Sequence, residues 1–218
     1  MQRILVMDTE TTGLVDPIYV VEVAWCEIDD ELGIISEFDT LINPEVPIPC
    51  VASGISGIRD EDVVDSPKIT DIEFPEGEIT FIGHNTPYDY PLLKPHCNII
   101  ACIDTLKLAR RLIKGPESYA LGALSCYCGL PRQLNHRALN DVRDTLALLD
   151  WMCREFEMDL QEMYDESNTQ RRLDLMPFGK HKGTQMELVP YDYIQWLLNS
   201  GGKLDDDMRF TIKQIWNI

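Results

Sequence analysis

The sequence lacks several features that would assign it to the membrane or to the exterior of the cell. It has no run of about 18 apolar residues, so no membrane-spanning helix is predicted. The N-terminus reaches an acid at Asp8, too early for the apolar region of a signal peptide. The seven cysteines are odd in number and include no Cys-x2-Cys pair, which favours free thiols over a zinc site or a disulfide framework. These absences predict a cytoplasmic protein with reduced thiols.

Basic residues are also scarce. The chain has 19 Lys and Arg against 37 Asp and Glu, a formal net charge of −18 at pH 7. Nucleic-acid binding normally uses a basic surface, so this balance argues against strong phosphate contact. Two clusters of bases, at residues 107–114 and 171–182, and any divalent cations held by the acids would oppose the acidic balance locally. Solvated surfaces explain the two clusters equally well. The composition predicts at most weak, salt-sensitive contact with nucleic acid.

The pattern of apolar residues predicts an α/β fold. Short apolar runs indicate strands at residues 3–7, 19–27, 34–42, 79–83 and 99–103. The first three follow one another with short turns, which implies antiparallel pairing and therefore a mixed five-stranded sheet. Helices are expected at 105–113 and 119–128, in a short segment that begins near Arg59 or Asp60, and in a long amphipathic segment with Asn140 as its N-cap.

The composition changes near residue 155. We therefore expect a main domain at 1–155, a partly helical connector at 156–175 and a small C-terminal module at 176–218. The module should contain a strand–turn–strand at 176–184 and helices at 190–199 and 205–216. About 40 residues are marginal for independent folding, so the module is expected to dock on the main domain or on DNA.

Acidic side chains gather where predicted strands end. Asp8 and Glu10 follow the first strand, and Asp89 comes shortly after the fourth. Buried carboxylates are costly unless something pairs with them, and oxygen ligands without thiolates suit Mg²⁺ or Mn²⁺. Asp141 opens the long helix, and His136 should lie on the loop before it, because a five-residue step within one helix would separate their side chains. A histidine there could accept a proton from an attacking water, so the pattern predicts two-metal phosphodiester hydrolysis.

Three motifs together resemble the DEDDh-type (DnaQ-like) 3′–5′ exonuclease superfamily. They are Asp8-Thr-Glu-Thr-Thr-Gly-Leu14, His84-Asn-Thr-Pro-Tyr-Asp89 and His136-x4-Asp141, and the resemblance covers residues 3–153. It implies an RNase H-like fold and the release of nucleoside 5′-monophosphates from 3′ ends of DNA. It also implies two Mg²⁺ ions as cofactors, with Mn²⁺ as a substitute.

The resemblance assigns roles to these residues. Asp8, Glu10, Asp89 and Asp141 would be metal ligands, and His136 would be the general base. The backbone around Thr11 and the side chain of Leu14 would hold the terminal nucleotide, although Leu14 as an ordinary core residue is the alternative. His84 and Asn85 would contact substrate, or would only form a structural turn at the end of the strand.

The C-terminal module sharpens the resemblance. Residues 105–112, together with 178–183 and 193–197, are similar to an exodeoxyribonuclease X-like subfamily. Lys180 and Lys182, on a glycine-flanked turn, are expected to contact DNA phosphates. The alternative is a module that only covers the main domain through Tyr193, Trp196 and Leu197. The tryptophans are interpreted as core residues, although Trp196 or Trp216 could stack on a base.

The predicted function is therefore a 3′–5′ exodeoxyribonuclease that acts on single-stranded DNA ends and, as an extension, on duplex ends. An RNA-trimming enzyme of the same superfamily is the first alternative, because the core motifs do not specify the sugar. A proofreading or tethering subunit of a DNA replication or repair complex is the second. A replication or repair protein is accordingly an expected partner.

Overall fold

The protein is described by a computed structural model that covers residues 2–131, 136–200, 204 and 206–218. The chain divides into two compact units, Met1–Asn168 and Thr169–Ile218. Each unit has its own hydrophobic core, and each is described by itself.

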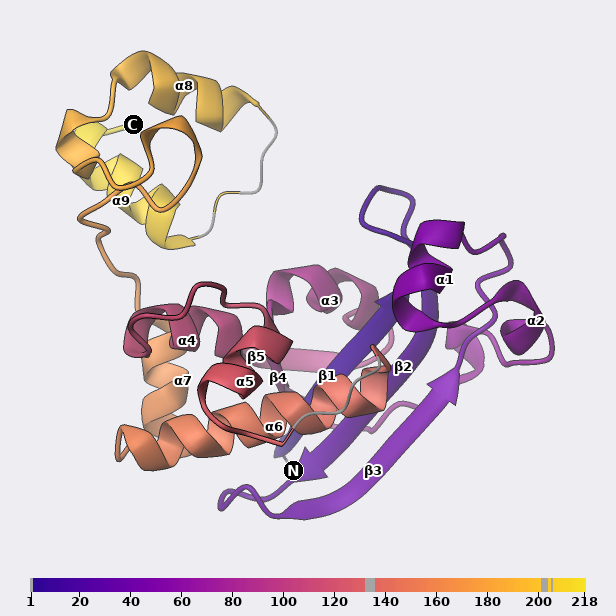
Figure 1. Cartoon of the computed structure of the whole chain (residues 1–218). Coiled ribbons are helices and arrows are strands. Elements are labelled where there is room, and N and C mark those ends of the chain that lie inside the picture. Colours follow the sequence, from indigo (N-terminus) through magenta and orange to yellow (C-terminus); the bar gives the residue numbers. More distant parts are fainter. Residues whose placement is uncertain (1, 132–135, 201–203, 205) are drawn as a thin grey trace. The chain divides into compact units, whose positions relative to one another are not determined.

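The first unit is built on a five-stranded mixed sheet with the order β3-β2-β1-β4-β5 (Figure 1). The central strand β1 pairs antiparallel with β2, which pairs antiparallel with β3, whereas β1–β4 and β4–β5 are parallel. This confirms the predicted α/β fold with a mixed sheet. The strands are β1 (Gln2–Thr11), β2 (Val20–Ile28), β3 (Ile34–Leu41), β4 (Glu78–Gly83) and β5 (Asn98–Asp104).

Strand β1 is longer than its apolar run. The predicted strand at 3–7 ends too early, because Asp8 pairs with Ala24 and Glu10 with Glu22 on β2, and Thr11 still belongs to the strand. Successive side chains of a strand point to opposite faces, so Asp8 and Glu10 share one face of the sheet. Residues directly opposite each other in an antiparallel pair also share a face, which places Glu22 beside Glu10.

Helix α6 (Ala138–Glu155) covers this acidic face, packing on β1 and β2 (Figure 1). Its predicted apolar face is confirmed, since Val142, Leu146, Leu149 and Met152 are all buried. The predicted N-cap, Asn140, is wrong: the helix begins at Ala138, whose N–H donates to the Glu22 carboxylate at 2.8 Å. The carboxylate of Glu22 on β2 therefore takes the place of a capping side chain from the helix's own N-cap residue. The neighbouring helices are α4 (Thr105–Leu112), α5 (Leu121–Tyr127) and α7 (Leu160–Asn168), which packs on β5 and α4 although it lies within the predicted connector.

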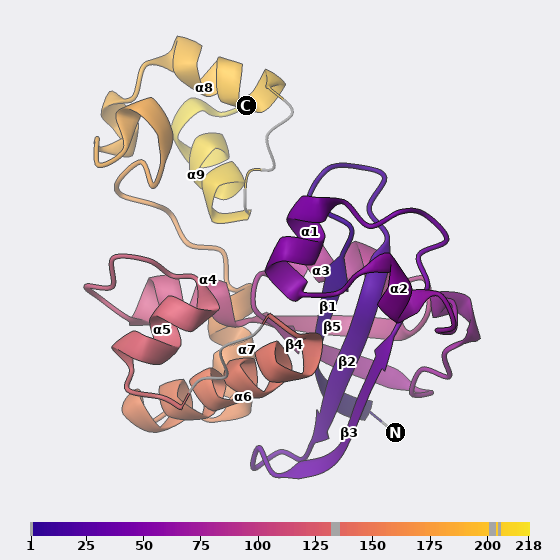
Figure 2. The ribbon, with the colours of Figure 1, turned by 45° about the vertical axis from the view of Figure 1, so that its right-hand side comes forward.

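Helix α3 (Thr86–Leu93) packs beside β4 and β5 and was not predicted. Pro87 in its first turn and Pro91 in its interior disguise it, and it has no clear apolar stripe. Helix α1 (Cys50–Ser56), after three prolines, was also missed, whereas α2 (Asp60–Val63) begins where expected. Both contribute to a small core with Val21 of β2, and Figure 2 shows the two helices near β2. A 3-10 turn, η1 (Ile69–Asp71), precedes β4.

The second unit contains two short 3-10 turns and two helices: η2 (Gly179–His181), η3 (Met186–Leu188), α8 (Tyr191–Asn199) and α9 (Asp206–Trp216). The predicted strands at 176–184 do not form; the chain reverses there through η2, with an isolated bridge between Leu175 and Gln185. The two predicted helices are confirmed as α8 and α9, although position 205 lies outside the described residues. Throughout the described part of the chain, no helix is both long and apolar enough to cross a membrane.

Candidate active site

Four acidic side chains from three elements come together around the carboxyl end of β1. Asp8 and Glu10 come from β1, Asp89 from the first turn of α3, and Asp141 from the first turn of α6. The hydroxyl of Thr9 donates to Asp89 at 2.6 Å, which ties α3 to β1. The carboxylate of Asp8 is repelled by the charges of Asp89, Asp141 and Glu10, so all four lie close together. The structure thus brings together all four acids that the sequence singled out.

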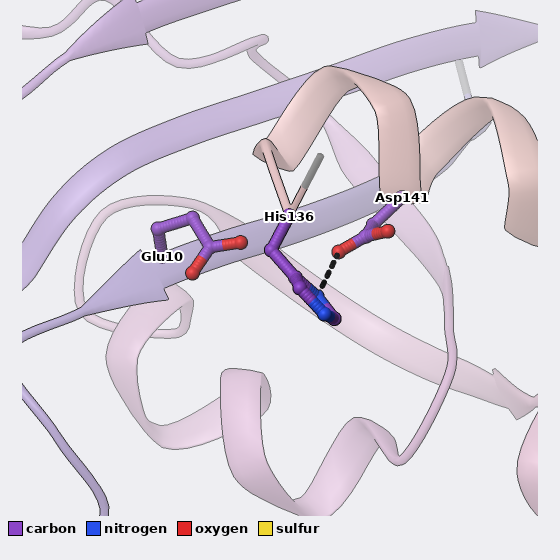
Figure 3. A group of neighbouring side chains, drawn as sticks. All are labelled: Glu10, His136 and Asp141. Atoms are coloured by element: carbon purple, nitrogen blue, oxygen red, sulfur yellow. Dashed lines mark ion pairs between the residues drawn. The ribbon is translucent and has the colours of Figure 1, made fainter. Parts of the chain in front are cut away.

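His136 completes this cluster. One ligand atom each of Glu10, His136 and Asp141 lie within 4.8 Å of one another (Figure 3). The Nδ1 atom of His136 is 3.8 Å from a carboxylate oxygen of Asp141. His136 lies before the start of α6, as expected from the five-residue spacing, and its side chain is 54% exposed. An exposed imidazole beside fixed carboxylates can exchange protons with water.

The acids share an electrostatic cost. Loss of hydration raises the pKa of Asp8 well above its ordinary value, and repulsion by Asp89, Asp141 and Glu10 adds to the shift. Burial, then repulsion by Asp141 and Glu22, raises the pKa of Glu10 to about 7. Burial also raises the pKa of Asp89 to about 7, although the bond from Thr9 opposes this. Such a cluster is unfavourable alone, and cations bound there would relieve its repulsion.

The donor set fits hard divalent cations. Carboxylate oxygens converge from β1, α3 and α6, and no thiol takes part in the cluster of Glu10, His136 and Asp141. Mg²⁺ and Mn²⁺ prefer oxygen ligands of this kind. Within the described residues this is the one group of His, Cys, Asp and Glu with metal-binding spacing. All seven cysteines are free thiols; Cys26 is buried, Cys50 and Cys126 are exposed, and the others are partly buried.

The loop after β1 lies next to the acids and is fastened by Tyr88 of α3. The Tyr88 hydroxyl donates to the Gly13 carbonyl at 2.7 Å and lies 2.6 Å from the hydroxyl of Thr11. Leu14, the next residue, is 81% exposed. Leu14 is therefore not a core residue, which removes the alternative interpretation. An exposed leucine on a fastened loop beside the acids is available for contact with a base.

His84 and Asn85 differ in their availability. Both ring nitrogens of His84 are engaged, Nδ1 with the Thr105 hydroxyl at 3.0 Å and Nε2 with the Tyr119 carbonyl at 2.9 Å. Burial lowers the pKa of His84. A buried ring with both nitrogens bonded favours the alternative that His84 stabilises the turn at the end of β4. Asn85 is exposed in a left-handed conformation with φ of 77°, and its N–H donates to Asp104 at 3.0 Å. Its side chain remains accessible.

Glu22 is a residue of this site that sequence reasoning missed. It is fully buried on β2, opposite Glu10. Its carboxylate accepts hydrogen bonds from Nε of Arg137 and from the N–H of Ala138, each at 2.8 Å. It therefore holds the segment between His136 and Asp141 against the sheet. The available signal was a single acid within the apolar strand Val-Val-Glu-Val-Ala, because a buried charge requires a partner.

Lys180 and Lys182 belong to the second unit, which the structure does not place relative to the acids. Both lysines are exposed at the turn η2. Gly183, after the turn, has φ of 82°, a conformation that favours glycine. The two ammonium groups are thus presented to solvent on a tight bend.

Comparison with known proteins identifies relatives of the chain. A model of an exonuclease family, RNase T, matches residues 5–149. Exodeoxyribonuclease 10 of Escherichia coli strain K12 is 31% identical over 95% of this chain and 96% of its own length. A DNA polymerase III subunit epsilon-like protein of Rhodobacter capsulatus is 31% identical, but over 63% of this chain and 22% of its own length.

Solved structures show the same fold. Exonuclease X in complex with 5′ overhanging duplex DNA is similar with a TM-score of 0.62 and 31% identity, over 77% of this chain and all of that chain. Exonuclease I of Escherichia coli in complex with a dT13 oligonucleotide has a TM-score of 0.57. Its identity is 18%, over 72% of this chain and 43% of that chain, so this likeness concerns the fold alone.

Proposed function

Because the chain belongs to the RNase T exonuclease family, we infer that it is a metal-dependent exonuclease that removes nucleoside 5′-monophosphates from 3′ ends of DNA. The observation that carries this inference is the convergence of Asp8, Glu10, Asp89 and Asp141 beside His136. Carboxylates from three separate elements lie close enough to repel one another, which is unfavourable for the protein alone. Bound cations would neutralise this repulsion.

Each residue has a proposed role. Asp8, Glu10, Asp89 and Asp141 would hold two Mg²⁺ ions, for which Mn²⁺ would substitute. When bound, such ions supply activation of the attacking water and stabilisation of the departing 3′-oxygen. His136 accepts a proton from the attacking water as general base. Its exposed ring can then release that proton to solvent.

The 3′ terminus would be held by the loop after β1. The backbone around Thr11, fastened by Tyr88, would contact the terminal 3′-hydroxyl, and Leu14 would press against the last base. The exposed side chain of Asn85 is a further candidate contact, whereas His84 supports the turn from within. Single-stranded ends fit this arrangement directly. Duplex ends are included because Exonuclease X, a similar protein of known structure, was solved in complex with a 5′ overhanging duplex.

One assay tests the proposed function. Labelled single-stranded DNA, duplex DNA and RNA are incubated with Mg²⁺, Mn²⁺ or EDTA, and the products are resolved by length. A ladder of mononucleotide steps from the 3′ end of DNA, absent in EDTA, is the expected result. Preferential shortening of RNA would favour the RNA-trimming alternative. Docking on a replication partner is suggested by the epsilon-like relative. DNA binding without turnover would favour such a tethering role.

We expect Glu22→Gln to lower kcat about tenfold while the KM for DNA stays close to wild type. The substitution keeps the shape but weakens the bonds from Arg137 and Ala138, so His136 and Asp141 are held less firmly. Residues that orient metal ligands typically contribute about 10–100-fold. Steady-state kinetics at several Mg²⁺ concentrations measure both constants.

Glu37→Gln is the matched control. Glu37 on β3 makes a similar two-bond pair, with Arg143 of the same helix, at 2.8 and 2.6 Å. This pair is exposed and lies beyond Asp141 along α6. A merely structural role for Glu22 would lower the melting temperature of Glu22→Gln and leave its kcat unchanged, as in the control.

The double variant Lys180→Ala, Lys182→Ala should weaken DNA binding equally across sequences. Each lysine that contacts a phosphate releases about one counterion, so the slope of log K against log salt should decrease by roughly two. Binding to a labelled oligonucleotide at several salt concentrations measures the slope. Lys213→Ala, an exposed lysine on α9 of the same unit, is the control. An unchanged slope in the double variant would mean that the turn does not contact DNA.

A further inference from the structure

The second unit carries a row of aromatic rings beside the two lysines. Tyr193 and Trp196, three residues apart on α8, stack with centroids 5.5 Å apart and planes at 27°. His181 of the turn η2 meets Tyr193 edge-on, with centroids 4.6 Å apart. We call His181, Tyr193 and Trp196 the aromatic row.

The fold holds the aromatic row in place. The opposite side of α8 is anchored in the core of the unit, since Ile194 and Leu197 are buried there. The turn that bears His181 lies directly against Tyr193: a Cβ on Gly179 would be 2.3 Å from the Tyr193 hydroxyl oxygen. Gly179 also has φ of 72°. Only glycine allows the turn to approach the ring this closely.

One ring of the aromatic row is largely exposed to solvent, whereas His181 and Tyr193 are half-buried. Trp196 is 59% exposed, contrary to its interpretation as a core residue. Tyr193 covers part of the indole, and the remainder faces solvent. An exposed indole continuous with two other rings indicates a binding surface rather than a chance exposure.

The charge distribution identifies the kind of ligand. Between residues 169 and 218 the chain has seven Lys and Arg against six Asp and Glu, a formal charge of +1, which leaves −19 for residues 1–168. Lys180 and Lys182 flank His181, at one end of the row. Aromatic faces with cations at their edge suit a strand whose bases stack and whose phosphates lie alongside.

From this arrangement we propose that the aromatic row binds single-stranded DNA, with a base stacked on Trp196 and the neighbouring phosphates at Lys180 and Lys182. The site belongs to the second unit, and stacking with phosphate contact recognises any stretch of strand without needing a 3′ end. The proposal rests on the proposed function, because DNA is the substrate that makes such a site useful.

The test uses the full chain and an intrinsic signal. A fluorescently labelled oligothymidylate is titrated in EDTA, which prevents hydrolysis, and anisotropy and tryptophan quenching are recorded. Trp196→Leu should weaken binding about 5- to 100-fold, the range for the loss of one base–aromatic stack, and should remove much of the quenching. Trp196→Phe keeps a ring and should lose much less. Tyr191→Leu, exposed on the same helix but outside the row, should bind as wild type.

The outcomes separate this proposal from the proposed function. Wild-type hydrolysis of the p-nitrophenyl ester of thymidine 5′-monophosphate tests the catalytic site alone, because that compound has no second base. If the ester is cleaved but Trp196→Leu binds oligothymidylate as tightly as wild type, the aromatic row is not a DNA site. A wild type that is dimeric by sedimentation, with a monomeric Trp196→Leu variant and equal DNA affinity, would assign the row to self-association and overturn the proposal.

Discussion

Asp8→Asn should abolish most DNA-end hydrolysis and make the metal-free protein more stable. Removing one charge-stabilising group from an organised site costs about 10²–10³-fold in rate, and a metal ligand should cost at least that. The stability gain follows from the raised pKa of Asp8, which reflects lost hydration and repulsion by Asp89, Asp141 and Glu10. The amide removes that repulsion while preserving shape.

The gain has a defined dependence on pH. In acid, Asp8 is protonated in both the folded and the unfolded state, so it does not lower the free energy of unfolding. As the pH rises above the ordinary range of aspartic acid, the unfolded chain loses the proton while the folded protein resists, so the free energy of unfolding falls. The loss of stability due to Asp8 reaches its full size above the raised pKa of that residue. The pKa values of Glu10 and Asp89 are also raised, each to about 7.

Melting temperatures measured in EDTA at pH 5 and pH 8 test this expectation. The variant should melt about 2–6 °C above wild type at pH 8, with a smaller difference at pH 5. Mg²⁺ should stabilise wild type by mass action and the variant much less. Asp150→Asn is the control, since Asp150 pairs with Arg154 elsewhere on α6. A less stable Asp8→Asn protein at pH 8, or one with near-native activity, would contradict the assigned role.

His136→Ala should lower kcat about 10²–10⁴-fold, the usual contribution of a general base. The KM for DNA should change little, because the loop after β1 is intact. A general base accepts a proton only in its unprotonated form, so with saturating metal the wild-type rate should rise with pH. The variant should lose this rise, which a pH profile of single-turnover rates can measure.

His96→Ala serves as the control histidine. Its ring stacks on Phe74 at 5.5 Å, on the other face of the sheet from the acids. It should keep both the rate and the pH profile of wild type. A flat wild-type profile between pH 6 and 8, with chemistry limiting, would exclude His136 as the base.

The sequence predicted the sheet well because its strands are apolar and β-branched. It missed α3 because Pro87 and Pro91 break the usual helical signals, although Pro87 is well placed in a first turn. It placed the start of α6 wrongly at Asn140, because the actual partner of the helix terminus is Glu22, more than a hundred residues earlier. A local pattern cannot reveal a cap that arrives from a distant strand.

The same reasoning explains the site. The four acids and His136 could be proposed from the sequence because they belong to short motifs that are recognisable without knowledge of the fold. Glu22 and Tyr88 act through contacts between elements, with Ala138 and with Gly13 respectively, which only the packed chain defines. The exposure of Trp196 was equally hidden, since tryptophan in apolar surroundings is usually buried.

The long separation between Glu10 and Asp141, which lie together in the site, has a consequence for synthesis of the protein. A ribosome adds about 5–20 residues per second, so roughly 7–26 seconds pass between the making of Glu10 and that of Asp141. For nearly all of that interval the nascent chain holds β1 and its acids but neither His136 nor α6. A chain terminated early, before α6, would therefore be an inert fragment, and a nuclease that would otherwise attack DNA ends is withheld until most of its first unit exists.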